Sequence, residues 1–183
     1  DAPPVTYTPT GSACTLNAGA GDGGSQIPTS DGKCWIAKTI QTVDPRIWGA
    51  KEDCATDDTA AVQAAVNYAL APATQAKTLT MTGPALLTSS VNINRLVDTS
   101  YNDFVIEGHG KTAGFCVSSP ITMFDSTLTF STTPVSERVT FKNVYFQSAN
   151  LADAAYVMSH KFLRIVFDHS NFLQIKVVSG TIY

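Results

Sequence analysis

The sequence RIWGAKEDCATDDTAAVQAAVNYA (residues 46–69) joins an acidic loop to a short helical pattern. Apolar residues recur there at helical spacing, at positions Ala61, Val62, Ala65, Val66 and Ala69. Thr56 is predicted to cap this helix, and Asp57 and Asp58 suit the positive end of its dipole. Pro72 ends it. A helix so rich in alanine is slender and must lie on a larger apolar surface, so residues 57–70 are predicted to form a cap.

The loop before this helix carries a family resemblance. It resembles the opening segment of the pectate-lyase-like superfamily of right-handed parallel β-helices, which includes phage tailspikes. In that family an aromatic-Gly-Ala-Lys-Gly-Asp-Gly run precedes Thr-Asp-Asp-Thr and an Ala-rich helix that plugs the end of the β-helix. The matching residues are Trp48, Gly49, Ala50, Lys51, Asp53, Thr56, Asp57, Asp58 and Thr59, whereas Glu52 and Cys54 stand where glycine is usual. The resemblance implies an all-β solenoid with an N-terminal capping α-helix and an extended N-terminal arm.

A weak repeat follows Pro72, in short segments rich in strand-forming residues. VTFKNVYF (139–146) aligns with IVFDHSNF (165–172) at a constant offset, and FVIEG (104–108) fits the same frame. Repeats of this kind are typical of solenoids, in which each rung buries its inward face against its neighbours. The side chains expected to point inward and stack are Val139, Phe141, Phe146, Ile165, Phe167 and Phe172.

One column of the repeat predicts a bend. It holds Gly108, Asn143 and His169, residue types that tolerate the left-handed backbone region. The GHG sequence around His109 is similar to a polygalacturonase motif. It fits better the structural Ile-x-Gly-x-Gly-Lys pattern of early rungs in the resembling family, so His109 is interpreted as a turn residue.

The chain is therefore divided into an arm or linker (1–43), a capping segment (44–72) and the first rungs of a longer β-helix (73–183). Cys14 and Cys34 bracket a Gly-rich loop that a disulfide would restrain, and Cys54 could reach Cys116. Disulfides in a secreted protein and buried thiols in a reducing cytoplasm both remain open. Trp35 and Trp48 are expected to cover the core rather than to bind sugars.

Composition restricts the partners. The 183 residues carry a net charge of −3 without a basic stripe, which argues against nucleic acid. No apolar run is long enough to cross a bilayer. The family resemblance implies a polysaccharide partner, an extracellular, cell-surface or virion location, and a homotrimer or larger assembly. The strand-like end of the sequence at Tyr183 predicts an exposed edge that a longer chain or other subunits would cover.

Polysaccharide cleavage needs an acid and a base, and three carboxylates in the repeat region qualify: Glu107, Asp125 and Asp168. The alignment puts Glu107, Lys142 and Asp168 in one outward column. Alternating charges of this kind are also typical of a solvated ion-pair ladder, which is the favoured interpretation. Whether the chain is a lyase, a glycoside hydrolase or no enzyme is left open.

Calcium is the one cofactor for which the sequence contains candidate ligands. Asp53, Asp57 and Asp58 supply the oxygen ligands that calcium prefers, although helix capping explains them without an ion. The resemblance implies that the chain recognises a surface polysaccharide, and it leaves open whether the chain also depolymerises it. The alternative is a non-catalytic structural or adhesion module of a larger surface or virion-like assembly, because this fold hosts both.

Overall fold

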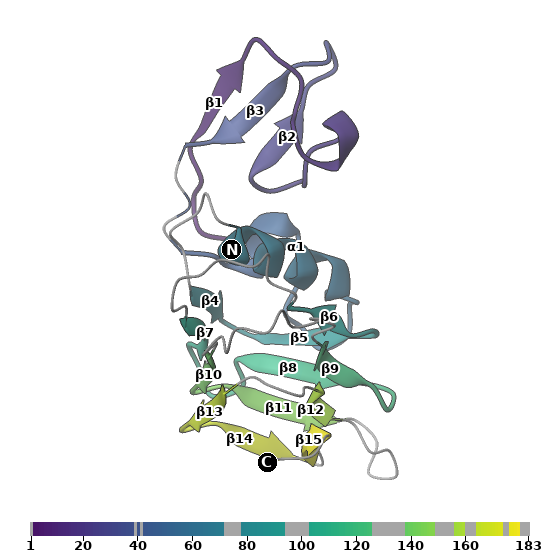
Figure 1. Cartoon of the computed structure of the whole chain (residues 1–183), viewed down its shortest axis with the longest axis vertical. Helices are drawn as coiled ribbons and strands as arrows, with labels where there is room; N and C mark the ends of the chain where they lie inside the picture. The colour runs from purple at the N-terminus through teal and green to yellow at the C-terminus, as the bar shows by residue number, and fades with distance from the viewer. Residues whose placement is uncertain are drawn as a thin grey trace, which may run out of the picture.

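The computed structural model describes residues 2–38, 40, 42–71, 78–93, 103–125, 138–148, 156–159, 164–173 and 176–179. In Figure 1 a small sheet stands above helix α1, and the later strands form a stack below it. The described part of the chain is thus mostly β structure, interrupted by one α-helix.

The small upper sheet replaces the extended arm expected for the first residues. Its strands are β1 (Tyr7–Thr10), β2 (Gln26–Pro28) and β3 (Cys34–Ala37), antiparallel in the order β1-β3-β2, with the 3-10 helix η1 (Asn17–Gly19) between β1 and β2. A Cys14–Cys34 disulfide closes the loop, and the Asp22 carboxylate accepts hydrogen bonds from the Gly24 and Gln26 amides. These contacts hold the segment in a sheet, although its sequence has no apolar periodicity from which a sheet could be predicted.

The head sheet, defined as β1 to β3 with their loops, contacts the cap through Gly24. A Cβ at Gly24 would lie 2.4 Å from Trp48 Nε1, so only glycine lets the backbone meet this indole ring. The ring of Trp48 lies 5.5 Å from that of Tyr68 on α1.

Trp48 packs against the core as predicted, but the prediction for Trp35 was wrong, because Trp35 is 41% exposed on the open face of the sheet.

The cap consists of the 3-10 helix η2 (Pro45–Trp48) and α1 (Thr59–Leu70). The buried face of α1 carries the expected Val62, Ala65, Val66 and Ala69. Asp58 rather than Thr56 occupies the N-cap position, because Thr56 donates its hydroxyl to Asp53 inside the preceding loop. In the part of the chain that the structure describes, no helix is long and apolar enough to cross a membrane.

Below the cap, the described strands build three parallel sheets of four strands each. The first sheet contains β4 (Thr78–Met81), β7 (Asp103–Gly108), β10 (Arg138–Lys142) and β13 (Arg164–Asp168); the second contains β5 (Pro84–Leu87), β8 (Gly114–Val117), β11 (Tyr145–Ser148) and β14 (Asn171–Leu173); the third contains β6 (Val91–Asn92), β9 (Thr122–Asp125), β12 (Tyr156–Ser159) and β15 (Lys176–Ser179). Three consecutive strands, one in each sheet, make one rung, and the four rungs lie under one another (Figure 1).

The register of the repeat is the one predicted from the sequence. Phe141 pairs with Phe167 and Ile106, and Phe146 pairs with Phe172. The rings of Phe141 and Phe167 stack at 5.2 Å, and those of Phe146 and Phe172 stack at 5.1 Å. Val139, Phe141 and Phe146 are buried, whereas Ile165, Phe167 and Phe172 are partly buried against the same cluster, which confirms their inward orientation.

The cap closes the upper edge of all three sheets. Thr80 of β4 donates its amide to the Val43 carbonyl at 2.8 Å. The carbonyls of β5 accept from the cap loop, Pro84 from the Cys54 amide at 2.8 Å and Leu86 from the Asp58 amide at 2.9 Å. On β6, the Gln63 side chain accepts from the Asn92 amide and donates to the Asn92 carbonyl. Backbone groups that an uncovered edge would leave open are thereby satisfied.

The bend column is confirmed at two of its three positions. Asn143 and His169 have φ angles of 54° and 51°, in the left-handed region. Gly108 does not share this conformation and is needed for another reason. A Cβ at Gly108 would lie 2.3 Å from the Asn143 carbonyl oxygen, so the close approach of two rungs requires glycine there.

A second disulfide ties the cap to the stack. It joins Cys54 in the cap loop to Cys116 in β8, across 62 residues of sequence. Cross-linking a loop of this length stabilises a protein by about 4 kcal/mol in the chain-entropy account. Both pairings that the sequence allowed are thus present, and the cap is covalently fixed to the second rung.

We predict that Phe141→Ala lowers the free energy of unfolding by about 3 to 5 kcal/mol, because it leaves a cavity among stacked rings. Phe167→Ala should cost less, since Phe167 is only partly buried. Urea denaturation followed by circular dichroism measures both, with the half-buried Thr140→Ala as a control. A Phe141→Ala variant as stable as the Thr140→Ala control would contradict the stacking account.

Candidate functional site

The charged column predicted from the sequence exists on the first sheet. Lys142 in β10 pairs in register with Glu107 of β7 on one side and Asp168 of β13 on the other. Because neighbouring strands lie about 4.8 Å apart, the two carboxylate-bearing positions are roughly 9.6 Å apart along the stack. Lys142 stands between them, where a glycosidase would need a sugar or a water molecule.

Glu107 is engaged by its neighbours. Its Oε1 lies 2.8 Å from Lys142 Nζ, and its Oε2 lies 3.7 Å from His109 Nε2. The hydrogen bond from Lys142 lowers the pKa of Glu107 below its usual range, and the same contact raises the pKa of Lys142. A carboxylate that stays ionised suits a base or an ion-pair partner and not a general acid, which needs a raised pKa.

The other two catalytic candidates lie apart from this pair. Asp168 Oδ1 lies 2.5 Å from Nδ1 of His169, and the His169 side chain is 82% exposed. Asp125 ends β9 in the third sheet, where its carbonyl accepts from the Ile93 amide. The structure therefore brings Glu107 and Asp168 into one column with Lys142 and leaves Asp125 on a different sheet. The catalytic assignment of all three stays a prediction.

The acidic residues of the cap loop, proposed from sequence as calcium ligands, hold the loop together. Asp53 accepts from Ala55 and Thr56, Asp57 accepts from Thr59 and Thr88, and Asp58 accepts from the Lys51 and Glu52 amides. Every carboxylate oxygen of the three is engaged in these bonds. Among the described residues, no group of three His, Cys, Asp or Glu side chains could hold a metal ion. Calcium binding by this trio stays a sequence prediction.

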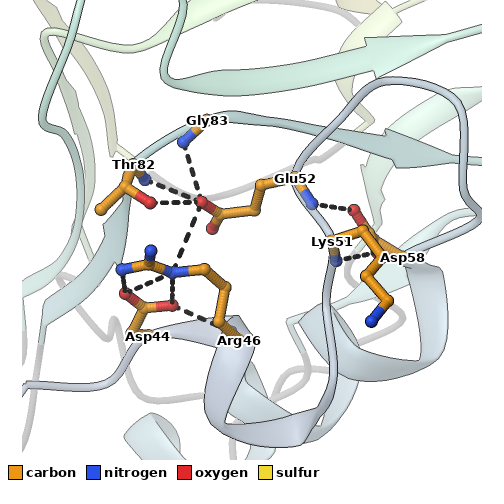
Figure 2. A network of polar contacts seen from close by, with 7 residues as sticks. All are labelled: Asp44, Arg46, Lys51, Glu52, Asp58, Thr82 and Gly83. Carbon is orange, nitrogen blue, oxygen red and sulfur yellow. Dashed lines mark hydrogen bonds and ion pairs between the residues drawn. The ribbon is translucent and has the colours of Figure 1, made fainter. Parts of the chain in front are cut away.

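A buried polar network in the cap was missed by sequence reasoning (Figure 2). Glu52 Oε2 accepts from the Thr82 amide and hydroxyl and from the Gly83 amide, at 3.1, 2.6 and 2.8 Å. Arg46 lies between Glu52 and Asp44, with its Nε 3.8 Å from Glu52 Oε2 and its Nη2 2.6 Å from Asp44 Oδ2. Glu52 stands where the family pattern has glycine, and this departure was the one sign of the network in the sequence. The glutamate anchors the loop to the turn before β5.

The same loop explains the other departure from the family pattern. Glu52 and Cys54 have φ angles of 52° and 56°, the left-handed conformation in which glycine is usual. This conformation costs free energy in residues other than glycine, and contacts of the two side chains offset that cost. Glu52 accepts a hydrogen bond from Thr82, and Cys54 forms a disulfide with Cys116. The loop therefore takes a left-handed conformation at both positions, and the two side chains anchor it to the turn at Thr82 and to Cys116.

A cavity of about 470 Å³ lies between the N-terminal segment and the approach to the cap. Among the described residues, its lining is mostly apolar, with Lys38 as the charged residue: Pro3, Pro4, Val5, Thr6, Lys38, Ile40, Thr42 and Ile47. It contains none of the acid and base candidates.

The comparisons with known proteins concern the fold. No protein-family model matches the chain, and no curated protein matches it. The tailspike protein of Acinetobacter baumannii phage AM24 superposes with a TM-score of 0.65 at 17% identity, over 93% of this chain and 30% of that one. This chain has a tailspike-like fold.

Two further solved structures align more loosely. ORF18 of Geobacillus virus E2 has a TM-score of 0.49 at 19% identity, over 82% of this chain and 31% of that one. Tailspike protein 2 of an Escherichia coli O157:H7 bacteriophage has a TM-score of 0.38 at 13% identity, over 94% of this chain and 29% of that one. This chain therefore spans about 30% of the length of the structures it resembles.

We predict that Glu107→Gln changes the free energy of unfolding by less than about 1 kcal/mol, because its ion pair with Lys142 is partly exposed. The small effect should shrink further at high salt, which screens exposed charges. Urea denaturation at low and high sodium chloride measures it. A loss comparable to that of Phe141→Ala would show that the column is structurally essential.

We predict a pH dependence from Glu52. Burial raises the pKa of Glu52 above its ordinary value of 4.5, so the native state keeps a proton that the unfolded chain has released. Stability from this group therefore falls as pH rises from 4.5 through the raised pKa, by at most about 1.4 kcal/mol per pH unit.

The Glu52→Gln variant isolates this contribution. Glutamine keeps an oxygen for the Thr82 and Gly83 donors but carries no charge, so the variant should gain stability relative to the native chain as pH rises. Urea denaturation of both proteins from pH 4.5 to pH 8 measures the difference. Parallel pH profiles would contradict the assignment.

Proposed function

We propose that this chain is the opening part of a tailspike-like, right-handed parallel β-helix that recognises a bacterial surface polysaccharide. The observation that carries the proposal is the capped stack of in-register rungs, with three parallel sheets facing one apolar core. Strands that return to the same parallel sheet do so by right-handed connections in nearly all proteins, which supports the handedness. The pectate-lyase-like pattern of the cap loop supports the same family.

The proposal divides the chain into a head (1–43), a cap (44–72) and first rungs (73–183). It places the protein outside the cell, on a virion or a cell surface, as part of a homotrimer or larger assembly. The two disulfides support an oxidising location, because such bonds persist mainly outside the reducing cytoplasm. The likeness to the AM24 phage tailspike protein supports the fold on which this role rests.

A second candidate is a non-catalytic structural or adhesion module, and one observation favours it for the first sheet. Glu107 is held ionised by Lys142, so the column behaves as a charge ladder. We infer that this chain binds polysaccharide without cleaving it. Lyase or hydrolase chemistry would then belong to other parts of a longer protein.

The purified chain should bind at least one member of a panel of bacterial capsular and O-antigen polysaccharides without producing new reducing ends or unsaturated products. Affinity electrophoresis measures the binding, and a reducing-end assay with ultraviolet absorbance measures cleavage. Cleavage that Glu107→Gln or Asp168→Asn abolishes would establish an enzyme. Failure to bind any glycan would leave the structural role alone.

A further inference from the structure

The open face of the head sheet carries a short apolar row. Trp35 pairs in register with Pro9 of β1 on one side and Ile27 of β2 on the other. Directly opposed residues of antiparallel strands point to the same face, so the three side chains lie side by side. All three are exposed, Trp35 by 41% and Ile27 by 37%.

A rigid base holds this row in place. β3, the central strand of the sheet, carries Trp35, and the adjacent Cys34 is joined to Cys14. At the other end of the sheet, the Tyr7 hydroxyl donates to the Gly24 carbonyl at 2.7 Å, and Gly24 packs against Trp48 of the cap. The indole is therefore presented on a fixed platform, which lowers the entropy that a ligand must overcome.

Polar groups border the row at one end. Lys33 lies two residues before Trp35 in the sequence, in the turn directly before β3, where its carbonyl accepts from the Thr29 amide and its amide donates to the Thr29 hydroxyl. Its ammonium is 2.8 Å from Asp31 Oδ2, and the Thr29 hydroxyl binds the other oxygen of Asp31. Lys33 and Asp31 are half exposed, so they keep donors and acceptors free for a ligand.

The size of the row argues against a protein partner. An aromatic side chain can bury about 150 to 250 Å², of which the 41% exposure of Trp35 leaves roughly 60 to 100 Å² accessible, so the three side chains together offer at most on the order of 200 Å². A stable protein interface buries about 800 Å² on each partner. A single sugar ring needs only an aromatic face and a few hydrogen-bonding groups beside it, which is what this row provides.

The charge of the surroundings narrows the ligand class. Lys33 is neutralised by Asp31, and the whole chain carries a net charge of −3. A strand of nucleic acid that stacks on aromatic residues needs a positively charged groove as well. A polyanion is therefore disfavoured, and a neutral sugar fits.

We propose that Trp35, flanked by Pro9 and Ile27 and bordered by the Lys33–Asp31 pair, is a stacking site for a neutral pyranose unit of the polysaccharide. The inference rests on the proposed polysaccharide recognition and assigns it to the head instead of the rung faces. The sugar ring lies against the indole, and its vicinal hydroxyl groups bind Lys33 and Asp31.

The test uses the whole chain and the same panel of capsular and O-antigen polysaccharides. Trp35→Ala should weaken binding of the recognised glycan at least tenfold, and Trp35→Phe should restore part of it. The matched control is Leu16→Ala, which removes a side chain of similar exposure. The amides of Thr15 and Leu16 bind the Gln26 side chain, which belongs to the opposite face of the sheet, so Leu16→Ala should bind like the native chain.

Nuclear magnetic resonance of the indole N–H groups locates the ligand directly. On titration with the glycan, the Trp35 signal should shift and the Trp48 signal should stay, because Trp48 lies under the head against Gly24. Native affinity in Trp35→Ala would overturn this inference while leaving polysaccharide recognition in place. A lower sedimentation mass of Trp35→Ala than of the native chain would also overturn it, because it would show that the row is a contact between chains. Binding of no glycan by the native chain would overturn both proposals.

Discussion

The hydrogen bonds between the cap and the first rung are the constraint on which the structure depends. A parallel stack has an open upper edge in each sheet, and every unpaired backbone group there costs free energy or invites another chain. The cap closes the three edges by different means, through Val43 on β4, the cap loop on β5 and the Gln63 side chain on β6. The buried face of α1 then covers the apolar interior with Val62 and Val66.

The acidic loop can make these bonds because its own polar groups are fixed. The Asp58 carboxylate accepts from the consecutive backbone amides of Lys51 and Glu52, and the Glu52 side chain reaches across to the turn before β5. Residues that look from sequence like metal ligands or dipole partners thus act as connections within the loop. These hydrogen bonds hold the backbone of the cap loop in place, whereas the head presents an exposed aromatic side chain, Trp35.

The sequence was most informative where packing repeats. Phe141 on Phe167 and Phe146 on Phe172 were predictable, because inward residues of successive rungs must match in register. The antiparallel pairing of the head sheet was not, because a disulfide and the Asp22 carboxylate fold it in place of an apolar pattern. The burial predicted for Trp35 was wrong, because its exposure depends on a strand pairing that the sequence does not reveal. The Glu107–Lys142 pair followed from the repeat, whereas the partners of Glu52 lie 30 residues away in sequence and carry no motif.

Hydrogen–deuterium exchange on a Val62→Asp variant tests most directly whether the stack depends on its cap. Val62 is fully buried, so a carboxylate there should lift α1 from the first rung, whereas Ala60→Asp on the exposed side of the same helix serves as the control. We expect the amides of β4, β5 and β6 to lose protection in Val62→Asp, while β1 to β3, held by the Cys14–Cys34 disulfide, change little. Unchanged protection of β4, β5 and β6 in a soluble Val62→Asp variant would contradict the account.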